Sequence, residues 1–260
     1  MRAFTTKKQL TVVIPTFNEA ENLQKLVCVL FSLPLPNLKV LVVDDNSPDG
    51  TGTLADELHE KYPLQVSVRH RTGKLGLGTA YLEGFNQALS EGADAVGQMD
   101  CDFSHPPEKL VELLEGLEDH DIALGSRYVP GGGLDERWPL WRKGLSSWGN
   151  FYARTILSLP VCDATGGFRV WRREVLACMP LERVQSNGYA FQVEMAYLAT
   201  RLGFDFTEVP IYFADRRWGK SKMSFRIQVE AAVRVWQMLM AYRDVKPVTS
   251  RRQRPEARGQ

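Results

Sequence analysis

Short runs of apolar and β-branched residues alternate with longer amphipathic segments along the first half of the chain. The runs predict strands at residues 11–15, 38–44, 64–68, 93–99 and 122–124. The segments between them place apolar residues at helical spacing and predict helices near 20–31, 51–62, 78–89 and 107–117. Strands that alternate with helices favour an α/β fold with a mostly parallel central sheet and helices on both faces. In such a sheet, ligands bind beyond the carboxyl ends of the strands.

The second half of the chain has a less regular pattern. It predicts helices at 146–158 and 189–202, strands at 168–171 and 206–213, and a long final helix at 224–242. The final helix is apolar except for a stripe of Arg226, Glu230, Arg234 and Gln237. A helix this apolar is buried, and two surroundings stay open for it: the protein core or the headgroup region of a membrane.

The composition is that of a globular protein, with 44% hydrophobic and 24% charged residues. The net charge of +1 gives no support to a nucleic-acid-binding protein. The charge is unevenly distributed, because residues 246–260 carry five basic residues against Glu256, a net of +4, which leaves about −3 on the rest of the chain. We expect this segment to be a mobile basic tail with an anionic partner.

Four cysteines without a CxxC spacing indicate reduced thiols in a cytosolic protein. The polar start of the chain contains no secretory signal. The longest strongly apolar stretch, residues 229–242, is interrupted by Arg234 and Gln237 and is too short to span a bilayer. We therefore expect a soluble or peripheral protein.

Two acidic clusters follow predicted strands. Asp100 and Asp102 come directly after the strand at 93–99 and are separated by one residue, so extended backbone would project both carboxylates the same way. Such a pair of hard oxygen ligands suits Mg²⁺ or Mn²⁺, although a lone pair of this kind is often only solvated. Cys101 points away from the pair and is expected to pack.

The second cluster, residues 44–50, is a turn sequence, DDNSPDG. Asp44 and Asp45, at the end of the strand, are placed to accept hydrogen bonds from a nucleobase or ribose. Asp49 is either a helix cap or a ligand.

A glycine-rich segment and several late cations complete the candidate chemistry. Residues 74–80, KLGLGTA, resemble a phosphate loop but lack the established spacings, so the glycines fit close backbone packing equally well. Arg127 follows the strand at 122–124. Four more cations, Arg216, Arg217, Lys220 and Lys222, lie in one loop, which is either a solvated turn or a partner for a diphosphate.

Together these pieces resemble glycosyltransferase family 2, and more narrowly its dolichyl- or polyprenyl-phosphate mannosyltransferases. The resemblance runs in order from about residue 10 to about 225. The matching stretches are IPTFNEAENL (14–23), VDDNSPDGT (43–51), KLGLGTAY (74–81), MDCDFSHP (99–106), GSRY (125–128), DATGGFR (163–169), FQ and EM (191–192 and 194–195) and GKSK (219–222). The first two mark the wider family, whereas LGLGTAY, TGGFR and GKSK are more specific to the polyprenyl-phosphate branch.

The resemblance implies a nucleotide-sugar-binding domain of the GT-A type over residues 1–245, with acceptor-side elements at roughly 126–245. The positions that match the family's nucleotide site are Pro15, Phe17, Glu19, Val43 and Asp45. Asp100 and Asp102 match its metal and diphosphate site, with Cys101 at a backbone contact. Arg127, Arg216 and Lys222 match the cations that contact donor or acceptor phosphates.

The chain departs from the family pattern at three places. Cys101 stands where the family usually has Ala, which is harmless if only the backbone is used. Ser147 stands where many relatives have an Arg before the Asn, here Asn150, and this weakens the case for an acceptor phosphate at that helix unless Arg142 or Lys143 substitutes. The C-terminal transmembrane helices of some relatives are not found here.

The implied reaction is inverting transfer of mannose from GDP-mannose to a polyprenyl monophosphate. Its nucleophile is a phosphate oxygen that is already ionised, so no general base is needed and His105 is expected to be structural. The implied partners are the donor, the lipid acceptor, a membrane surface on its cytoplasmic side and a membrane-anchoring subunit, with no nucleic acid.

Three alternatives are weighed against this reaction. They are a polyprenyl-phosphate glucosyltransferase that uses UDP-glucose, a non-catalytic subunit that binds a lipid phosphate, and a Rossmann oxidoreductase. The intact Asp100, Asp102, Arg127 and Lys222 argue against the second, and the absent GxGxxG against the third.

Overall fold

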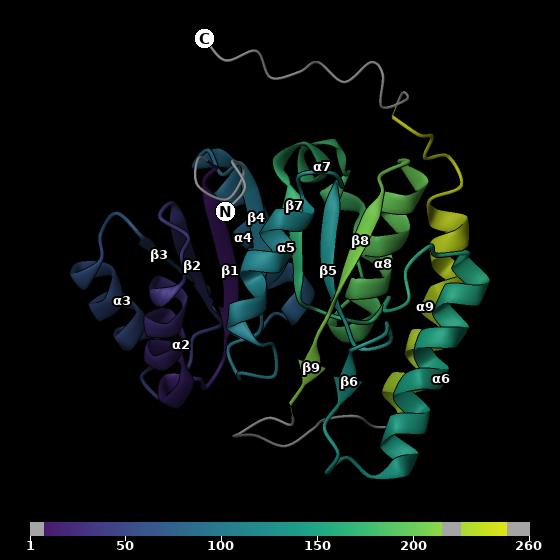
Figure 1. The fold of residues 1–260 in the computed structure, drawn as a ribbon, viewed down its shortest axis with the longest axis horizontal. Helices are drawn as coiled ribbons and strands as arrows, with labels where there is room; N and C mark the ends of the chain where they lie inside the picture. The colour runs from purple at the N-terminus through teal and green to yellow at the C-terminus, as the bar shows by residue number, and fades with distance from the viewer. Residues whose placement is uncertain (1–7, 215–224, 249–260) are drawn as a thin grey trace.

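The computed structural model describes residues 8–214 and 225–248, which form a central sheet covered by helices on both faces (Figure 1). The sheet has seven strands in the order β3-β2-β1-β4-β7-β5-β8. Their bounds are β1 (Leu10–Thr16), β2 (Leu38–Asp44), β3 (Val66–His70), β4 (Ala95–Gln98), β5 (Ile122–Ser126), β7 (Arg169–Arg172) and β8 (Phe206–Pro210). Strand β7 runs antiparallel to β4 and β5, and the other pairs are parallel. The predicted mostly parallel α/β sheet is therefore confirmed.

Two apolar clusters, one on each face of the sheet, hold the helices in place. On β1, Val12 and Ile14 belong to one cluster and Val13 to the other, as the alternation of side chains along a strand requires. The first cluster includes apolar residues of α2 (Ala20–Ser32), α3 (Thr51–Lys61) and α5 (Leu110–Gly116). The second includes apolar residues of α4 (Leu77–Ser90), α6 (Leu140–Leu157), α7 (Arg173–Cys178), α8 (Gly188–Arg201) and α9 (Phe225–Ala241). Short 3₁₀ turns occupy Pro107–Lys109 and Leu181–Arg183.

The strands and helices predicted in the first half are confirmed, and their ends differ by no more than two residues, except that the helix predicted from 107 begins with the 3₁₀ turn and α5 starts at Leu110. In the second half, two of the predicted elements differ, and the short elements α7 and β6 were not predicted. The strand predicted at 206–213 is split after Pro210, and its last part, β9 (Tyr212–Phe213), pairs with β6 (Gly133–Leu134) in a separate two-stranded sheet. The helix predicted at 146–158 begins at Leu140, directly after Pro139, since proline is common where a helix starts. Its first turn was not predicted because the polar residues there hide the helical spacing.

Helix α9 has two different sides. Val235 and Met238 are buried, whereas Val233, Trp236 and Met240 are exposed. Core packing is thus confirmed for one side of the final helix only. Among the helices of residues 8–214 and 225–248, none combines the length and the apolar content needed to cross a membrane.

The chain stays against the body for a few residues after Val245. The Val248 N–H donates a hydrogen bond to the Leu202 carbonyl at 2.9 Å, beyond the end of α8. The remainder of the predicted basic tail, from residue 249, lies outside the described residues. The four cysteines are free thiols, as expected.

Candidate active site

The carboxyl ends of β1, β2, β4 and β5 meet at one edge of the sheet, at the bottom of the view in Figure 1. This edge brings together residues that lie far apart in the sequence. The Asp45 N–H donates to the Thr16 carbonyl at 3.0 Å, which joins the turns after β1 and β2. Glu19 lies close enough to Cys101 to act electrostatically on its thiol. Val43 is also at this edge, but its side chain is fully buried in the core, which leaves only its backbone for a ligand.

Asp100 and Asp102 lie beyond the end of β4, on irregular rather than extended backbone. The chain bends through residues 101–103, and Phe103 has a positive φ of 59°. The expectation that extended backbone aligns the two carboxylates is therefore wrong. Instead, neutral donors position them: the Tyr81 hydroxyl donates to Asp100 Oδ1 at 3.0 Å, and the Ser104 N–H donates to Asp102 Oδ1 at 3.0 Å.

The environment of Tyr81 and Cys101 keeps both groups protonated. Burial raises the pKa of the Tyr81 phenol well above its usual value, and the neighbouring Asp100 carboxylate adds to the shift. Burial, together with Glu19 and the two aspartates, likewise raises the pKa of the Cys101 thiol. Tyr81 therefore acts as a permanent donor to Asp100. Cys101 is 2% exposed and packs in the core, as predicted.

His105 supports the turn that carries the two aspartates. Its Nδ1 accepts a hydrogen bond from the Asp100 N–H at 3.1 Å, so this nitrogen is unprotonated. The ring is buried and stacks on Phe168 with 5.2 Å between ring centroids. The structural role expected for His105 is confirmed.

The nucleotide side of the edge contains a cation that the sequence reasoning missed. Arg71 is buried and pairs with Asp45 at 2.5 Å, with further bonds to Glu83 at 3.0 Å and Thr79 at 2.6 Å. Burial raises the pKa of the Asp45 carboxyl, and the Arg71 guanidinium opposes that shift. Arg71 directly follows β3. Because ligands bind beyond the carboxyl ends of parallel strands, a basic residue at this position was a signal that could have placed Arg71 at the site.

Lys74 is placed over the ring of Phe17. Its Nζ lies 3.8 Å from the ring centroid, which is a cation–π contact. Phe17, a position that the resemblance assigns to the nucleotide, follows β1, and Lys74 precedes α4, so the contact joins the turn after β1 to the glycine-rich segment.

Asp44 and Asp49 hold turns. Asp44 is buried, and its Oδ1 accepts bonds from the hydroxyls of Thr16 at 2.9 Å and Ser47 at 2.6 Å. Asp49 accepts from the Thr51 N–H at 3.1 Å and the Ala20 N–H at 3.2 Å, and so ties the starts of α3 and α2 together. The capping alternative for Asp49 is confirmed. Asp44 is thus engaged in its own turn and Asp45 with Arg71, and the contact of Asp45 with a nucleotide stays a prediction.

The glycines of residues 74–80 serve close packing. A Cβ on Gly78 would lie 2.4 Å from the Ser186 carbonyl oxygen and 3.0 Å from the ring of Phe191. Gly76 has a φ of +110° and lies against Asn187 in the same way. The segment before α8 thus contacts the start of α4 at distances that only glycine permits.

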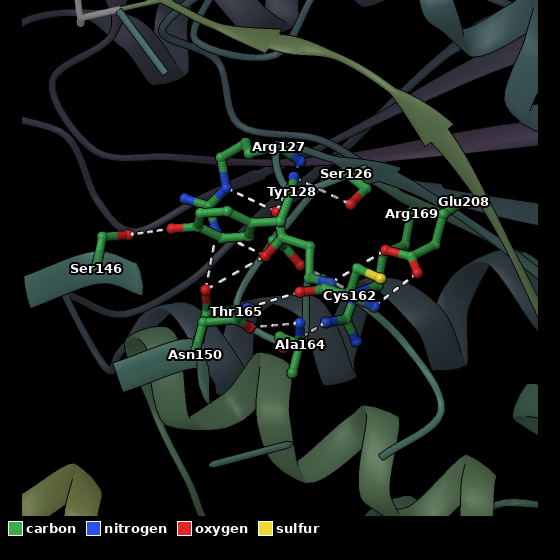
Figure 2. Close-up of polar contacts among 12 residues, drawn as sticks. Ser126, Arg127, Tyr128, Ser146, Asn150, Cys162, Ala164, Thr165, Arg169 and Glu208 are labelled. Atoms are coloured by element: carbon green, nitrogen blue, oxygen red, sulfur yellow. Dashed lines mark hydrogen bonds and ion pairs between the residues drawn. The ribbon is translucent and has the colours of Figure 1, made fainter. Parts of the chain in front are cut away.

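Arg127 lies in a buried ion pair (Figure 2). Its Nε donates to Asp163 Oδ2 and its Nη2 to Asp163 Oδ1, each at 2.7 Å, and Nη2 also donates to Thr165 Oγ1 at 2.7 Å. Burial alone would raise the pKa of Asp163, but the guanidinium outweighs burial and holds this pKa below its usual value. Both groups are therefore charged at neutral pH.

Hydrogen bonds fix the chain around Asp163 on both sides. Asn150 of α6 donates to the Cys162 carbonyl at 2.6 Å and accepts from the Ala164 N–H at 2.9 Å. Glu208 accepts from the N–H groups of Cys162 and Asp163 at 2.6 and 3.0 Å. Arg169, fully buried, donates to the Ala164 and Gly166 carbonyls (Figure 2). This polar network holds the chain segment that carries Asp163, the partner of Arg127.

Two proposed substitutes for an acceptor-binding arginine contact other groups. Arg142 stacks on Trp138, with its guanidinium carbon 3.6 Å from the ring centroid, and Lys143 donates to the Glu136 carbonyl at 3.4 Å. Arg216 and Lys222, the other predicted cations of the site, lie outside the described residues.

Comparison with known proteins decides the family. The model of glycosyl transferase family 2 matches residues 11–179. The chain belongs to glycosyl transferase family 2. This family 2 chain is 48% identical over 214 residues to the polyprenol monophosphomannose synthase of Mycolicibacterium smegmatis, and the alignment covers 82% of this chain and 80% of that protein. It is 44% identical over 235 residues to the undecaprenyl-phosphate mannosyltransferase of Micrococcus luteus, covering 90% and 96% of the two chains.

Solved structures of other glycosyltransferases share the fold of this family 2 chain. A glucosyl-3-phosphoglycerate synthase from Mycobacterium tuberculosis, crystallised with Mn²⁺, UDP and its product, aligns with a TM-score of 0.60 at 18% identity, covering 94% of this chain and 82% of that one. A mannosyltransferase from Pyrobaculum calidifontis, in complex with GDP-mannose and Mn²⁺, aligns with a TM-score of 0.54 at 17% identity, covering 95% and 80%. The GT-A fold expected from the sequence is confirmed.

The side chains at the edge of the sheet fit a hard divalent cation. Asp100 and Asp102 supply carboxylate oxygens on two sides of one turn, and both lie near enough to Tyr81 to raise its pKa. Residues 8–214 and 225–248 contain no group of three or more His, Cys, Asp and Glu side chains able to hold a metal. A pair of carboxylates with the remaining positions left to water and phosphate is the usual arrangement for Mg²⁺ beside a nucleotide.

Proposed function

We propose that this family 2 glycosyltransferase transfers mannose from GDP-mannose to a polyprenyl monophosphate with inversion, giving polyprenyl-phosphate mannose and GDP. The observation that carries the proposal is the pair of relatives at 48% and 44% identity, whose names specify a mannosyl group and a polyprenyl phosphate. The alignments span most of both chains, so the likeness concerns the whole catalytic domain rather than the nucleotide half alone.

The proposed nucleophile, a phosphate oxygen of the acceptor, is ionised at neutral pH and attacks the anomeric carbon without a general base. This agrees with the state of His105, whose buried ring is engaged with the backbone of Asp100. The work of the protein is to orient the two phosphates and offset their mutual repulsion.

Asp100 and Asp102 are the residues that would hold a divalent cation, Mg²⁺ or Mn²⁺, at the donor diphosphate. Such an ion supplies charge stabilisation for the departing GDP. Tyr81 and Ser104 hold the two carboxylates in place for this purpose. The groups proposed to bind the nucleotide are Pro15, Phe17, Glu19, Asp45 and the backbones of Val43 and Cys101.

The proposed cations for the phosphates are Arg127, Arg216 and Lys222. The Arg127 guanidinium already pairs with Asp163 and Thr165, and any contact with a phosphate must be compatible with these bonds. We propose that Arg127 acts from within this pair, as a fixed positive edge of the site, rather than as a side chain that swings onto the substrate. The reaction is proposed to occur at the cytoplasmic face of a membrane, where the acceptor is embedded.

A donor panel tests the proposed function. The purified chain is incubated with labelled GDP-mannose or UDP-glucose, a polyprenyl phosphate in detergent, and either MgCl₂, MnCl₂ or EDTA. We expect lipid-linked label from GDP-mannose with either metal and none with EDTA. Faster transfer from UDP-glucose would replace the proposed donor, and label transfer that EDTA leaves unchanged would remove the metal role of Asp100 and Asp102. Absence of transfer from every donor, with intact lipid-phosphate binding, would favour the non-catalytic subunit.

A further inference from the structure

The first turns of helix α8 contain a buried amide that the proposed reaction does not use. Gln192 belongs to the FQ pair of the matching stretches and is 3% exposed. Its Oε1 accepts a hydrogen bond from Gln98 Nε2 at 2.6 Å. Within residues 8–214 and 225–248, no group accepts a hydrogen bond from the Gln192 NH₂ group. Because a buried donor without a partner costs free energy, this NH₂ group is positioned for something other than the fold.

A group that can only donate determines which end of the Gln192 amide faces away from Gln98. The indole N–H of Trp171 has no acceptor capacity, and its Nε1 lies 3.4 Å from Gln98 Oε1. Gln98 must therefore turn its NH₂ group toward Gln192, and Gln192 must accept with its oxygen. The NH₂ group of Gln192 consequently points away from this buried chain of hydrogen bonds.

The NH₂ group of Gln192 lies beside Gly167. A Cβ on Gly167 would lie 3.3 Å from Gln192 Nε2 and 3.4 Å from Cε1 of His105. Any other residue would thus place a methyl group against the amide, and only glycine leaves it uncovered. Gly167 is partly exposed, whereas Gln98 and Trp171 are fully buried. A ligand therefore reaches the amide from the side of Gly167.

Gly167 lies between the two charged ends of the candidate site. On one side, His105 accepts from the N–H of Asp100, a residue proposed to hold the metal at the donor diphosphate. On the other side, a Cβ on Gly166 would lie 3.3 Å from Cγ of Asp163, in the buried ion pair. In the proposed reaction the sugar passes from a diphosphate at the first end to a phosphate at the second. Its hydroxyl groups would then lie near the amide.

Contacts of the neighbouring residues hold this part of α8 in place. The Phe191 ring stacks on Tyr81 with 5.9 Å between ring centroids, and the Tyr81 hydroxyl donates to Asp100. The backbone carbonyl of Gln192 accepts from Nη1 of the buried Arg169 at 2.8 Å. The amide is therefore held relative to Asp100 before a ligand binds, which lowers the cost of using it in recognition.

We propose that the Gln192 amide donates a hydrogen bond to a hydroxyl group of the sugar carried by the nucleotide donor, and that this bond helps to select the sugar. The inference rests on the proposed function, which assigns the two ends of the site. Charged groups serve the phosphates at both ends, which leaves the neutral amide for a neutral hydroxyl. A site built to bond one hydroxyl discriminates against sugars that lack it or place it elsewhere.

The test measures binding to the full chain by isothermal titration calorimetry in the presence of MnCl₂. The ligands are GDP-mannose, UDP-glucose and the free nucleotides GDP and UDP. Gln192→Met keeps the length of the side chain but removes the donor. The matched control, Gln98→Met, breaks the same hydrogen bond between the two glutamines and leaves the Gln192 amide in place. Circular dichroism and thermal unfolding establish that both variants are folded.

A second variant approaches the same amide without changing it. Gly167→Ala places a methyl group 3.3 Å from Gln192 Nε2. It covers the NH₂ group while every hydrogen bond of Gln192 is kept. Gly167→Ala therefore tests the proposal even if Gln192→Met does not fold.

We expect Gln192→Met to bind the preferred nucleotide sugar about tenfold more weakly and the matching free nucleotide within twofold of wild type. Gly167→Ala should show the same difference between the two ligands. Gln98→Met should weaken binding of the nucleotide sugar by less than about threefold, because the amide remains. The KM for the lipid acceptor should stay unchanged in all three variants.

Three results would overturn the proposal. Equal weakening of nucleotide sugar and free nucleotide in Gln192→Met would assign the amide to the nucleotide or to the fold. Unchanged binding of the nucleotide sugar with a raised KM for the acceptor would assign it to the acceptor phosphate. Equal losses in Gln192→Met and Gln98→Met would leave only a structural role. If the loss is specific to the sugar but the wild type transfers no label to any polyprenyl phosphate, the sugar contact stands and the proposed function fails.

Discussion

The ends of strands β4 and β5 hold their charged side chains in different ways. At the end of β4, Asp100 and Asp102 accept hydrogen bonds from neutral donors, Tyr81 and Ser104, and their negative charge is not cancelled by these contacts. Beyond β5, Arg127 is neutralised by Asp163 in a buried, bidentate pair. The hydrogen bonds at the first site bring no opposite charge to the carboxylates, whereas the second site pairs a guanidinium with a carboxylate.

This difference predicts what a substitution at each site should change. Neutral donors orient a carboxylate without lowering its affinity for a cation, so the β4 end is suited to a metal and a diphosphate. A buried ion pair is costly to break, because removal of one partner leaves the other charge uncompensated. Substitutions at the β4 end should therefore change activity with little effect on stability, and substitutions in the Arg127 network should change both.

The largest expected effect is on turnover. Asp102→Asn keeps the shape and an acceptor for Ser104 but removes the charge, and we expect turnover of GDP-mannose to fall about 10³-fold, or about 4 kcal/mol, with unchanged unfolding in urea. The control is Glu57→Gln, an exposed acid on α3. Turnover of Asp102→Asn within tenfold of wild type would remove this carboxylate from the site.

Asp163→Asn should cost about 3 kcal/mol of unfolding free energy, because the amide leaves the Arg127 guanidinium buried without a counter-charge. Urea denaturation gives the value from the shift in midpoint. The matched control is Glu112→Gln, which removes the exposed ion pair with Lys109 and should change stability by less than about 1 kcal/mol. Equal losses of unfolding free energy in the two variants would mean that the buried ion pair is no more costly to break than the exposed one.

Gly78→Ala tests the seam between the two halves. The added methyl group would lie 2.4 Å from the Ser186 carbonyl oxygen, so α4 and the segment before α8 must separate, at about 2 kcal/mol. Gly144→Ala is the control with opposite sign: it lies in α6 with nothing within 4 Å of an added Cβ and should stabilise by about 0.5–1 kcal/mol. Equal destabilisation by both would mean that the cost of Gly78→Ala does not come from the close contact with Ser186.

The smallest effect is a pH dependence. The folded pKa of Asp163 lies below the ordinary value of 3.8, so its contribution to stability is fully present above about pH 4 and is lost as pH falls toward the folded pKa. The stability difference between wild type and Asp163→Asn should therefore be constant above about pH 4 and then narrow by at most about 1.4 kcal/mol per pH unit. A difference that widens with acid would contradict this sign.

Much of the nucleotide half was predictable, because its information is local. The strands before Asp44 and Asp100 are apolar runs between turn residues, and the side chains at their ends follow from the geometry of parallel strands. The arrangement of those ends was less predictable. Extended backbone was expected at Asp100–Asp102, but the chain bends at Phe103. The position of Arg71 after a strand was a usable signal, but its pairing with Asp45 was not, because nothing local links two residues 26 positions apart.

The sequence by itself determined the alternation of strands and helices, the acidic strand ends and the family, since each depends on neighbouring residues and on ordered motifs. The tertiary structure alone decided that β7 enters the sheet antiparallel, that Arg127 meets Asp163 across 36 residues, and that Tyr152 and Trp236, 84 residues apart, join α6 to α9 by a hydrogen bond. Hydrophobic periodicity reports which side of an element is buried, but the partner on that side is chosen by the packing of the whole chain.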